Sequence, residues 1–130
     1  MNFVESRLIG IQLDETGREV VLSLVETGGK RFALKLQGLE KLLVNEMRQQ
    51  NVIEGLVHWA KCDASPALRE AAFWLIAGAA EVACPPEAAI AIDKALDRVA
   101  RGDLELIEIT AIYGAQVIAA CAAMTLQSLD

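Results

Sequence analysis

The chain has little of the chemistry on which most hydrolytic active sites depend. It contains a single histidine, His58, and no nucleophile elbow of the GxSxG type. A Ser-His-Asp or Cys-His site would therefore have to use His58. Cys62 and Asp63 follow closely, and this proximity suggests a nucleophile and a base at the end of a strand. The simpler interpretation, a partly exposed histidine next to Trp59 where a strand becomes a loop, is favoured.

Cysteines are few and scattered: Cys62, Cys84 and Cys121 form no CxxC pair. The first residues also lack the basic segment and apolar run of a secretory signal. An odd number of cysteines without such a signal is typical of reduced thiols in a cytosolic protein, so we expect a cytoplasmic location. One histidine and no Cys/His cluster argue against a zinc site. The sequence thus predicts neither a metal nor a cofactor.

Phosphate-binding motifs and an excess of basic residues are absent as well. Neither GxGxxG nor GxxxxGK[ST] occurs, and the glycine pair before Lys30 lies between two predicted strands, which favours a hairpin turn. Twelve Lys and Arg stand against eighteen Asp and Glu, so the net charge is −6. Nucleic-acid binding needs clustered cations at the phosphates, and we therefore expect no nucleic-acid partner.

The longest stretch without a charged residue runs over 109–129. It is long enough to span a bilayer. Polar residues interrupt it, however, no Lys or Arg anchors its ends, and its small residues suit close packing inside a protein. We therefore predict no membrane association.

The overall amino-acid composition is that of a folded domain. Hydrophobic residues make up 54% of the 130 residues and charged residues 23%, which excludes intrinsic disorder. Residues 1–59 contain one alanine, whereas 60–124 contain twenty. The first half is predicted to be rich in strands and the second in helices. Because each half alone is small for a stable domain, we predict one α+β domain over residues 1–130.

Alternating hydrophobic residues predict the strands of the first half. The segments 9–13, 20–24 and 32–36 alternate and are separated by glycine-containing turns, which predicts an antiparallel meander with one face in the core. In the first strand, Ile9, Ile11 and Leu13 would share a face. A fourth strand is predicted over 52–59.

The hydrophobic spacing changes to a helical period after Gly38. Leu39, Leu42, Leu43 and Met47 would share one face of a helix over 39–49. Ser65-Pro66 is a typical helix start, followed by a predicted helix over 66–82. A further helix over 87–101 would end at Gly102 and form an alanine-rich hairpin with the preceding one.

The last quarter of the chain allows two interpretations. The favoured one is a strand over 104–109, a break over 110–114, a short helix over 115–123 and a terminal strand over 125–129. The alternative is one long helix over 103–124. The predicted fold is therefore a meander of three to four strands packed against a helix and a helical hairpin, with a C-terminal strand-helix-strand.

Acidic residues are the main candidates for a binding surface. Residues 60–130 carry ten acidic and five basic side chains. Asp93 and Asp97 alternate with Lys94 and Arg98, a pattern more typical of a solvated helix face than of a metal site. We therefore expect a protein-binding module, specifically an inhibitor or immunity-type protein that blocks a basic partner such as a nuclease toxin. The expected contact residues are Asp93, Asp97, Asp103, Glu105, Glu108 and Trp74.

Two further hypotheses come from other classes of function. A pocket between sheet and helices could bind a small ligand or perform catalysis, with His58, Cys62 and Tyr113 as its polar groups. Tyr113 is the only tyrosine of the sequence and is otherwise predicted to form a structural corner. Alternatively, the neighbouring Phe73 and Trp74 could form the contact of a symmetric homo-oligomer.

Overall fold

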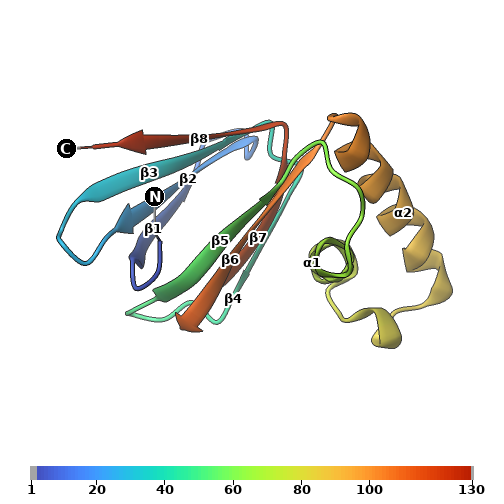
Figure 1. Ribbon diagram of the computed structural model, residues 1–130, viewed down its shortest axis with the longest axis horizontal. Coiled ribbons are helices and arrows are strands. Elements are labelled where there is room, and N and C mark those ends of the chain that lie inside the picture. The colour runs from blue at the N-terminus through green and yellow to red at the C-terminus, as the bar shows by residue number, and fades with distance from the viewer. Residues whose placement is uncertain (1–2, 130) are drawn as a thin grey trace.

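The computed structural model describes residues 3–129, which form one eight-stranded antiparallel sheet and two α-helices (Figure 1). The strands are Arg7–Leu13 (β1), Glu19–Val25 (β2), Arg31–Gln37 (β3), Lys41–Asn45 (β4), Val52–Trp59 (β5), Glu105–Tyr113 (β6), Gln116–Cys121 (β7) and Ala123–Ser128 (β8). The helices are Pro66–Ala77 (α1) and Pro86–Arg101 (α2), with a short 3₁₀ turn, Glu81–Ala83 (η1), between them. The predicted α+β class is confirmed, but the sheet is much larger than a meander of three to four strands.

The sheet folds back on itself into two layers (Figure 1). The strand order is β4-β7-β6-β5-β1-β2-β3-β8, so β1, β2, β3 and β8 form one layer and β4 to β7 the other. The chain passes between the layers at Gly38 and Ala122, where β3 leads into β4 and β7 into β8. Because β3 pairs with β8 and β4 with β7, a two-stranded ribbon bends at this point. Both helices cover the outer side of the β4–β7 layer.

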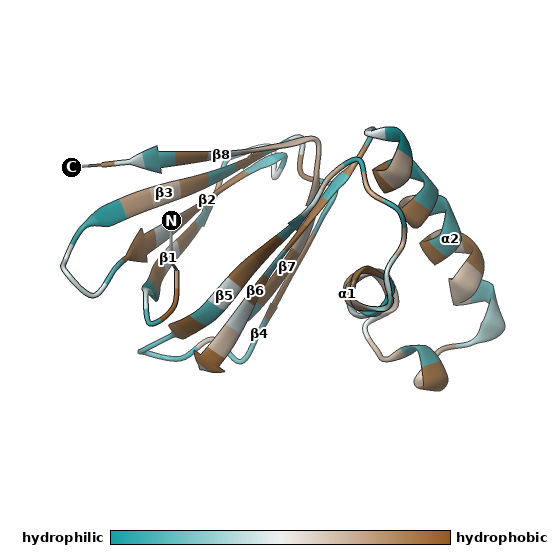
Figure 2. Cartoon of the chain, in the orientation of Figure 1, coloured by the Kyte–Doolittle hydropathy of each residue, from teal (hydrophilic) through white to brown (hydrophobic). Residues whose placement is uncertain are grey.

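Two hydrophobic cores lie on opposite sides of this second layer. Figure 2 shows long hydrophobic stretches, in brown, along its strands β5 and β6. The first core fills the space between the two sheet layers, and the second lies between the sheet and the helices. Neighbouring side chains of one strand alternate between them: Leu106 belongs to the second core and Ile107 to the first. The strands β6 and β7 are therefore buried on both faces, and Val117 to Cys121 are all buried.

The predicted helix over 39–49 is wrong, because this segment contains the strand β4. Leu42 packs against the first core and Leu43 against the second, so the strand is apolar on both faces. Two adjacent leucines are compatible with a helical stripe and equally with a strand between two cores. Met47, which was expected on the helix face, is 47% exposed.

Of the favoured arrangement of the C-terminal quarter, the two strands over 104–109 and 125–129 are confirmed as β6 and β8, but the helix and the break between them are wrong. The segment over 115–123 is not a helix, since it forms β7 between β4 and β6, and the long helix over 103–124 is not formed either. Alanine favours helices, but pairing with a strand on each side and burial on both faces outweigh that preference. The break expected over 110–114 is reduced to Gly114, whose φ of 88° turns the chain from β6 into β7.

Smaller corrections concern single elements. A bulge between Leu8 and Gly10 turns Leu8 into the core and leaves Ile9 half exposed, so Ile9 does not share the core face with Ile11. Leu13, the last residue of β1, is half exposed as well. The helix expected over 66–82 ends at Ala77, because Gly78 adopts the left-handed conformation that closes it.

Other predicted features are confirmed. The strand over 52–59 has the expected bounds, and the strands over 20–24 and 32–36 present their alternate residues to the core. Ser65 caps α1, its Oγ accepting a hydrogen bond from the backbone N–H of Leu68 at 3.2 Å. Gly102 ends α2 in the left-handed conformation.

No helix within residues 3–129 is long and apolar enough to cross a membrane.

Candidate functional site

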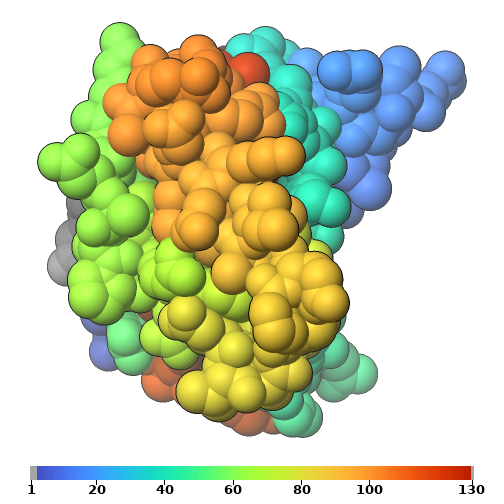
Figure 3. Space-filling model, turned by 90° about the vertical axis from the view of Figure 1, so that its right-hand side faces the viewer, coloured from blue at the N-terminus to red at the C-terminus, as the bar shows by residue number. Residues whose placement is uncertain are grey.

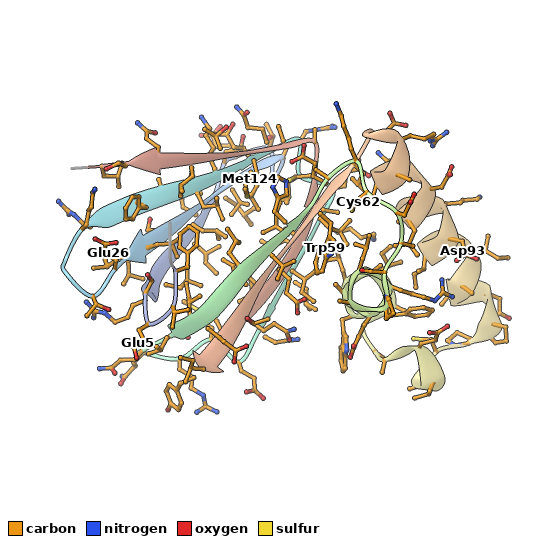
Figure 4. The ribbon with its side chains drawn as sticks, viewed as in Figure 1. Glu5, Glu26, Trp59, Cys62, Asp93 and Met124 are labelled. Carbon is orange, nitrogen blue, oxygen red and sulfur yellow. The ribbon has the colours of Figure 1, made fainter. Side chains whose placement is uncertain are left out.

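His58 does not form the predicted pair with a nucleophile. The strand β5 places it opposite Ile107 of β6, and its Nε2 lies 2.7 Å from Oε1 of Glu105. Cys62 packs against the second core between the sheet and the helices (Figure 4). Within the described chain, no hydrogen bond joins His58 to Cys62 or Asp63. Among residues 3–129, the hydrogen-bond partner of the imidazole is therefore a carboxylate and not a nucleophile that it could activate as a base.

Tyr113 lies far from this pair. It ends β6, eight residues beyond Glu105, which corresponds to about 26 Å along an extended strand. Its side chain is 54% exposed, and the Arg48 guanidinium lies over the ring at 5.3 Å from the centroid. The structure thus does not bring His58, Cys62 and Tyr113 together into one pocket.

The possible metal ligands and the buried Cys121 can be placed in the same way. No group of three or more His, Cys, Asp or Glu side chains in the described residues is arranged to hold a metal ion. Cys121 lies in the first core, and burial raises the pKa of its thiol to about 11. Such a thiol is protonated at neutral pH and is a poor nucleophile.

Each of the five carboxylates expected to bind a partner has a polar contact within its own chain. Oδ1 of Asp93 lies 2.9 Å from Nη1 of Arg69, which joins α2 to α1. Hydrogen bonds from Arg69 to Asp93 and Glu81 raise the pKa of the guanidinium above its ordinary value. The remaining contacts are Arg101 with Asp97 and with Asp103, both at 3.5 Å, His58 with Glu105 at 2.7 Å, and Gln116 with Glu108 at 2.8 Å.

These carboxylates are dispersed over the surface. Asp93 and Asp97 lie on α2, Asp103 follows it, and Glu105 and Glu108 lie on β6. Asp93, Asp97 and Asp103 are more than half exposed, so they remain available for long-range attraction although arginines neutralise part of their charge.

Trp74 lines a hollow that the sequence did not reveal. The hollow measures about 440 Å³ and is lined by Asn45, Glu46, Trp74, Gly114 and Gln116; we call it the Trp74 hollow. Glu108 lies outside this lining and is connected to it by Gln116, whose Nε2 donates to Oε2 of Glu108 at 2.8 Å. Trp74 is half-buried, its ring resting partly on the second core.

Glu46 and Gln116 were missed because the hollow depends on strand pairing. Asn45 of β4 lies opposite Gln116 of β7, 71 positions later in the chain. The hollow therefore requires β4 to be a strand, and the helical interpretation of 39–49 placed Glu46 elsewhere. No local signal in the sequence connects these residues.

Comparisons with known proteins assign no function. No protein-family model matches the chain, and no curated protein matches it. Among solved structures it is similar to the crystal structure of an uncharacterized protein from Neisseria gonorrhoeae, with 11% sequence identity and a TM-score of 0.43 over 99% of this chain and 97% of that chain. A likeness at this level supports no argument about function, which has to be inferred from this chain's own side chains.

Proposed function

We propose that this protein is a non-catalytic protein-binding module that engages a basic partner protein through the Trp74 hollow. It would act as an inhibitor of the immunity type, by covering a surface that the partner needs for its activity. The observation that carries the proposal is the half-buried Trp74 beside the exposed carboxylate of Glu46.

The chemistry of the hollow suits an arginine or lysine side chain. A cation over an indole ring is attracted by the ring's electron density, and tryptophan is the strongest such partner among the side chains. Glu46 is exposed and has no ion-pair partner among residues 3–129, so its carboxylate is available for a charge-assisted hydrogen bond. Tryptophan is also among the residues that most often dominate binding energy at protein interfaces.

The carboxylates of α2 would have a different role. A partner's cation at Asp93 or Asp97 would have to compete with Arg69 or Arg101, which already contact them. These residues and the net charge of −6 would instead increase the rate of encounter with a basic protein. We therefore expect strong salt dependence of the association rate and a smaller number of close contacts at the hollow.

Affinity capture from cells that contain this protein tests the proposal, with tagged wild-type protein at low and moderate salt. We expect one basic protein in stoichiometric amount, with less recovered as salt rises. Trp74→Ala should weaken its binding by at least about tenfold, and Glu46→Gln by several-fold.

Glu87→Gln is the matched control, because it changes the net charge equally at an exposed position outside the hollow. If no basic partner is recovered, or if Trp74→Ala binds it as well as the wild type does, the proposal is wrong. If Glu87→Gln and Glu46→Gln weaken binding equally, overall charge and not the hollow determines recognition.

A second candidate function, a subunit of a homodimer, is favoured by the edge strand β8. Charged residues and proline usually protect a sheet edge from pairing with another strand, and this strand, AMTLQS, contains neither. The backbone N–H of Leu129 donates to the Arg31 carbonyl of β3. In an antiparallel pair, alternate residues of a strand bond to the neighbouring strand, so Met124, Leu126 and Ser128 direct their backbone N–H and C=O groups to the free edge. Two copies could pair there about a two-fold axis at Leu126.

Molar mass by light scattering at micromolar concentration tests this candidate. We expect a dimer for the wild type and a monomer for Leu126→Pro, which removes an outward N–H without removing a bond to β3. Thr125→Ala, at a neighbouring position, should remain a dimer. A monomeric wild type would exclude the homodimer.

A further inference from the structure

A second hollow lies on the helical side of the molecule, between α2, α1 and the β4–β7 edge of the sheet. Figure 3 shows this face, with α2 in orange and yellow beside the cyan segment near residue 40. The hollow measures about 300 Å³, and we call it the α2 groove. It shares no residue with the Trp74 hollow and is therefore independent of the proposed function.

The floor of the α2 groove is apolar. Leu104 and Leu106 come from the start of β6 and Leu75 from the end of α1. All three side chains are at most 9% exposed, and the small residues Ala95 and Ala120 leave the space above them open. A concave apolar surface with a few polar groups at its mouth is typical of a small-molecule site.

The mouth of the groove is positively charged, in contrast to the protein as a whole. Arg98 donates two hydrogen bonds to Glu40, from Nη1 to Oε1 at 2.8 Å and from Nη2 to Oε2 at 2.7 Å. The hydrogen bond from Arg98 holds the pKa of the Glu40 carboxyl below its ordinary value. This bidentate pair is internally neutral and belongs to the lining of the groove.

Lys41 and Lys94 also line the groove, and neither has an ion-pair partner within residues 3–129. The four charged residues of the lining are thus three cations and one carboxylate, a local charge of +2 in a protein of net charge −6. Although Lys41 also acts on the Glu40 carboxyl through its charge, two lysines without a close ion pair beside an apolar floor are complementary to an anion that carries an apolar body.

We infer that the α2 groove binds a small amphipathic carboxylate, with its apolar body against Leu75, Leu104 and Leu106 and its carboxylate at Lys41 and Lys94. The volume lies at the lower end of the range for ligand sites, which limits the body to about the size of a medium-length acyl chain. The Glu40–Arg98 pair remains intact in this arrangement and separates the ligand's carboxylate from that of Glu40.

Isothermal titration calorimetry with sodium decanoate, below its micelle concentration, tests the inference. We expect saturable binding of one decanoate per chain and no detectable binding of acetate, which has the charge without the chain. Lys41→Gln and Lys94→Gln should each weaken decanoate binding about fivefold, the effect of one partly exposed ion pair. Neither change should affect binding of decanol, which has the chain without the charge.

A filling variant and a charge control complete the test. Ala91 is exposed and lines the groove, so Ala91→Trp should abolish binding without disturbing the core. Lys61→Gln removes the same charge outside the groove and should bind decanoate as the wild type does. Decanoate binding that does not saturate, or that survives Ala91→Trp and both groove lysine changes, would overturn the inference. A wild-type dimer that Ala91→Trp converts to a monomer would also overturn it, because a second copy would then occupy the groove.

Discussion

At the scale of single residues, Asn51 connects three segments that are distant in sequence. Its side chain is buried, with the residue 3% exposed. Oδ1 accepts from the backbone N–H groups of Arg48 and Ala115, both at 2.9 Å, and Nδ2 donates to the carbonyls of Arg48 at 2.9 Å and Leu8 at 3.5 Å. One amide thus joins β1, the loop before β5 and the turn between β6 and β7.

Replacing Asn51 with alanine should strongly destabilise the fold. Asn51→Ala leaves buried backbone groups without partners, so we expect the free energy of unfolding to fall by about 2–4 kcal/mol. Urea denaturation followed by circular dichroism measures this change. Gln50→Ala, at the exposed neighbouring position, should stay within about 0.5 kcal/mol of the wild type. Equal effects of the two substitutions would contradict the role assigned to Asn51.

Cys121 should make stability depend on pH in the alkaline range. Burial raises the pKa of its thiol from 9.0 to about 11, so the unfolded chain loses this proton at lower pH than the folded protein does. Stability is then unaffected well below pH 9 and falls between about pH 9 and 11. At pH 10.5 the loss from this group is about 2 kcal/mol.

Comparison with Cys121→Ala isolates this contribution, because other groups titrate in both proteins. We expect the wild type to lose about 2 kcal/mol more than Cys121→Ala between pH 8 and pH 10.5 in urea denaturation. Parallel curves for the two proteins would show that the buried thiol does not contribute.

At the scale of elements, the fold depends on the bend of the β3–β4 and β7–β8 ribbon. Gly38 has a φ of 65°, and a Cβ at this position would lie 2.7 Å from that of Ala122 on the adjacent strand. Backbone hydrogen bonds flank the bend: Ala122 N–H donates to the Gln37 carbonyl at 2.9 Å, and Glu40 N–H to the Ala120 carbonyl at 2.8 Å. The two strands therefore cross between layers in close contact, and a side chain at Gly38 would separate them.

Gly38→Ala should destabilise the protein by about 2–4 kcal/mol, the sum of left-handed strain and steric overlap with Ala122. Gly29→Ala provides the control, because Gly29 has a φ of 90° but no atom within 4 Å of its added Cβ. It should show the conformational cost alone, about 1 kcal/mol. Thermal denaturation compares the two, and a loss for Gly38→Ala no greater than for Gly29→Ala would contradict the close contact at the bend.

At the scale of the whole molecule, the two cores share one sheet layer. Because β6 and β7 contribute side chains to both cores, loss of the helical layer would expose Leu106 and Ile118 and weaken the strands that also close the first core. We therefore expect residues 1–130 to unfold as one cooperative unit, as the single-domain prediction requires.

Phe73→Ala tests this cooperativity. Phe73 is 2% exposed in the second core, so its truncation should lower the free energy of unfolding by about 3–5 kcal/mol. Trp59 and Trp74 both pack against this core and report it by fluorescence, whereas circular dichroism reports the sheet. The two transitions should coincide in the wild type and in the variant. A fluorescence transition that precedes the loss of sheet would indicate separate units, and Val82→Ala, at a 98% exposed position, should change neither signal.

Local features of the sequence determined a substantial part of this fold. Alternate residues of 20–24 and 32–36 face the first core, and the residues between them face the other side of the sheet. This alternating pattern therefore indicated strands correctly. The caps Ser65 and Gly102 act through their own backbone neighbours, and they marked the start of α1 and the end of α2. Composition likewise showed the acidic charge, and the order of the residues showed the lack of a GxSxG motif.

Only the tertiary structure decided the remaining strands and both hollows. The segments 41–45 and 116–121 are buried between two cores, and burial on both faces removes the alternation that distinguishes a strand from a buried helix. The decisive side-chain pairs join distant positions: His58 meets Glu105, Glu40 meets Arg98, and Asn45 lies opposite Gln116. Such pairs form only when strands and helices pack together. A local sequence pattern does not indicate which distant segment a side chain will contact.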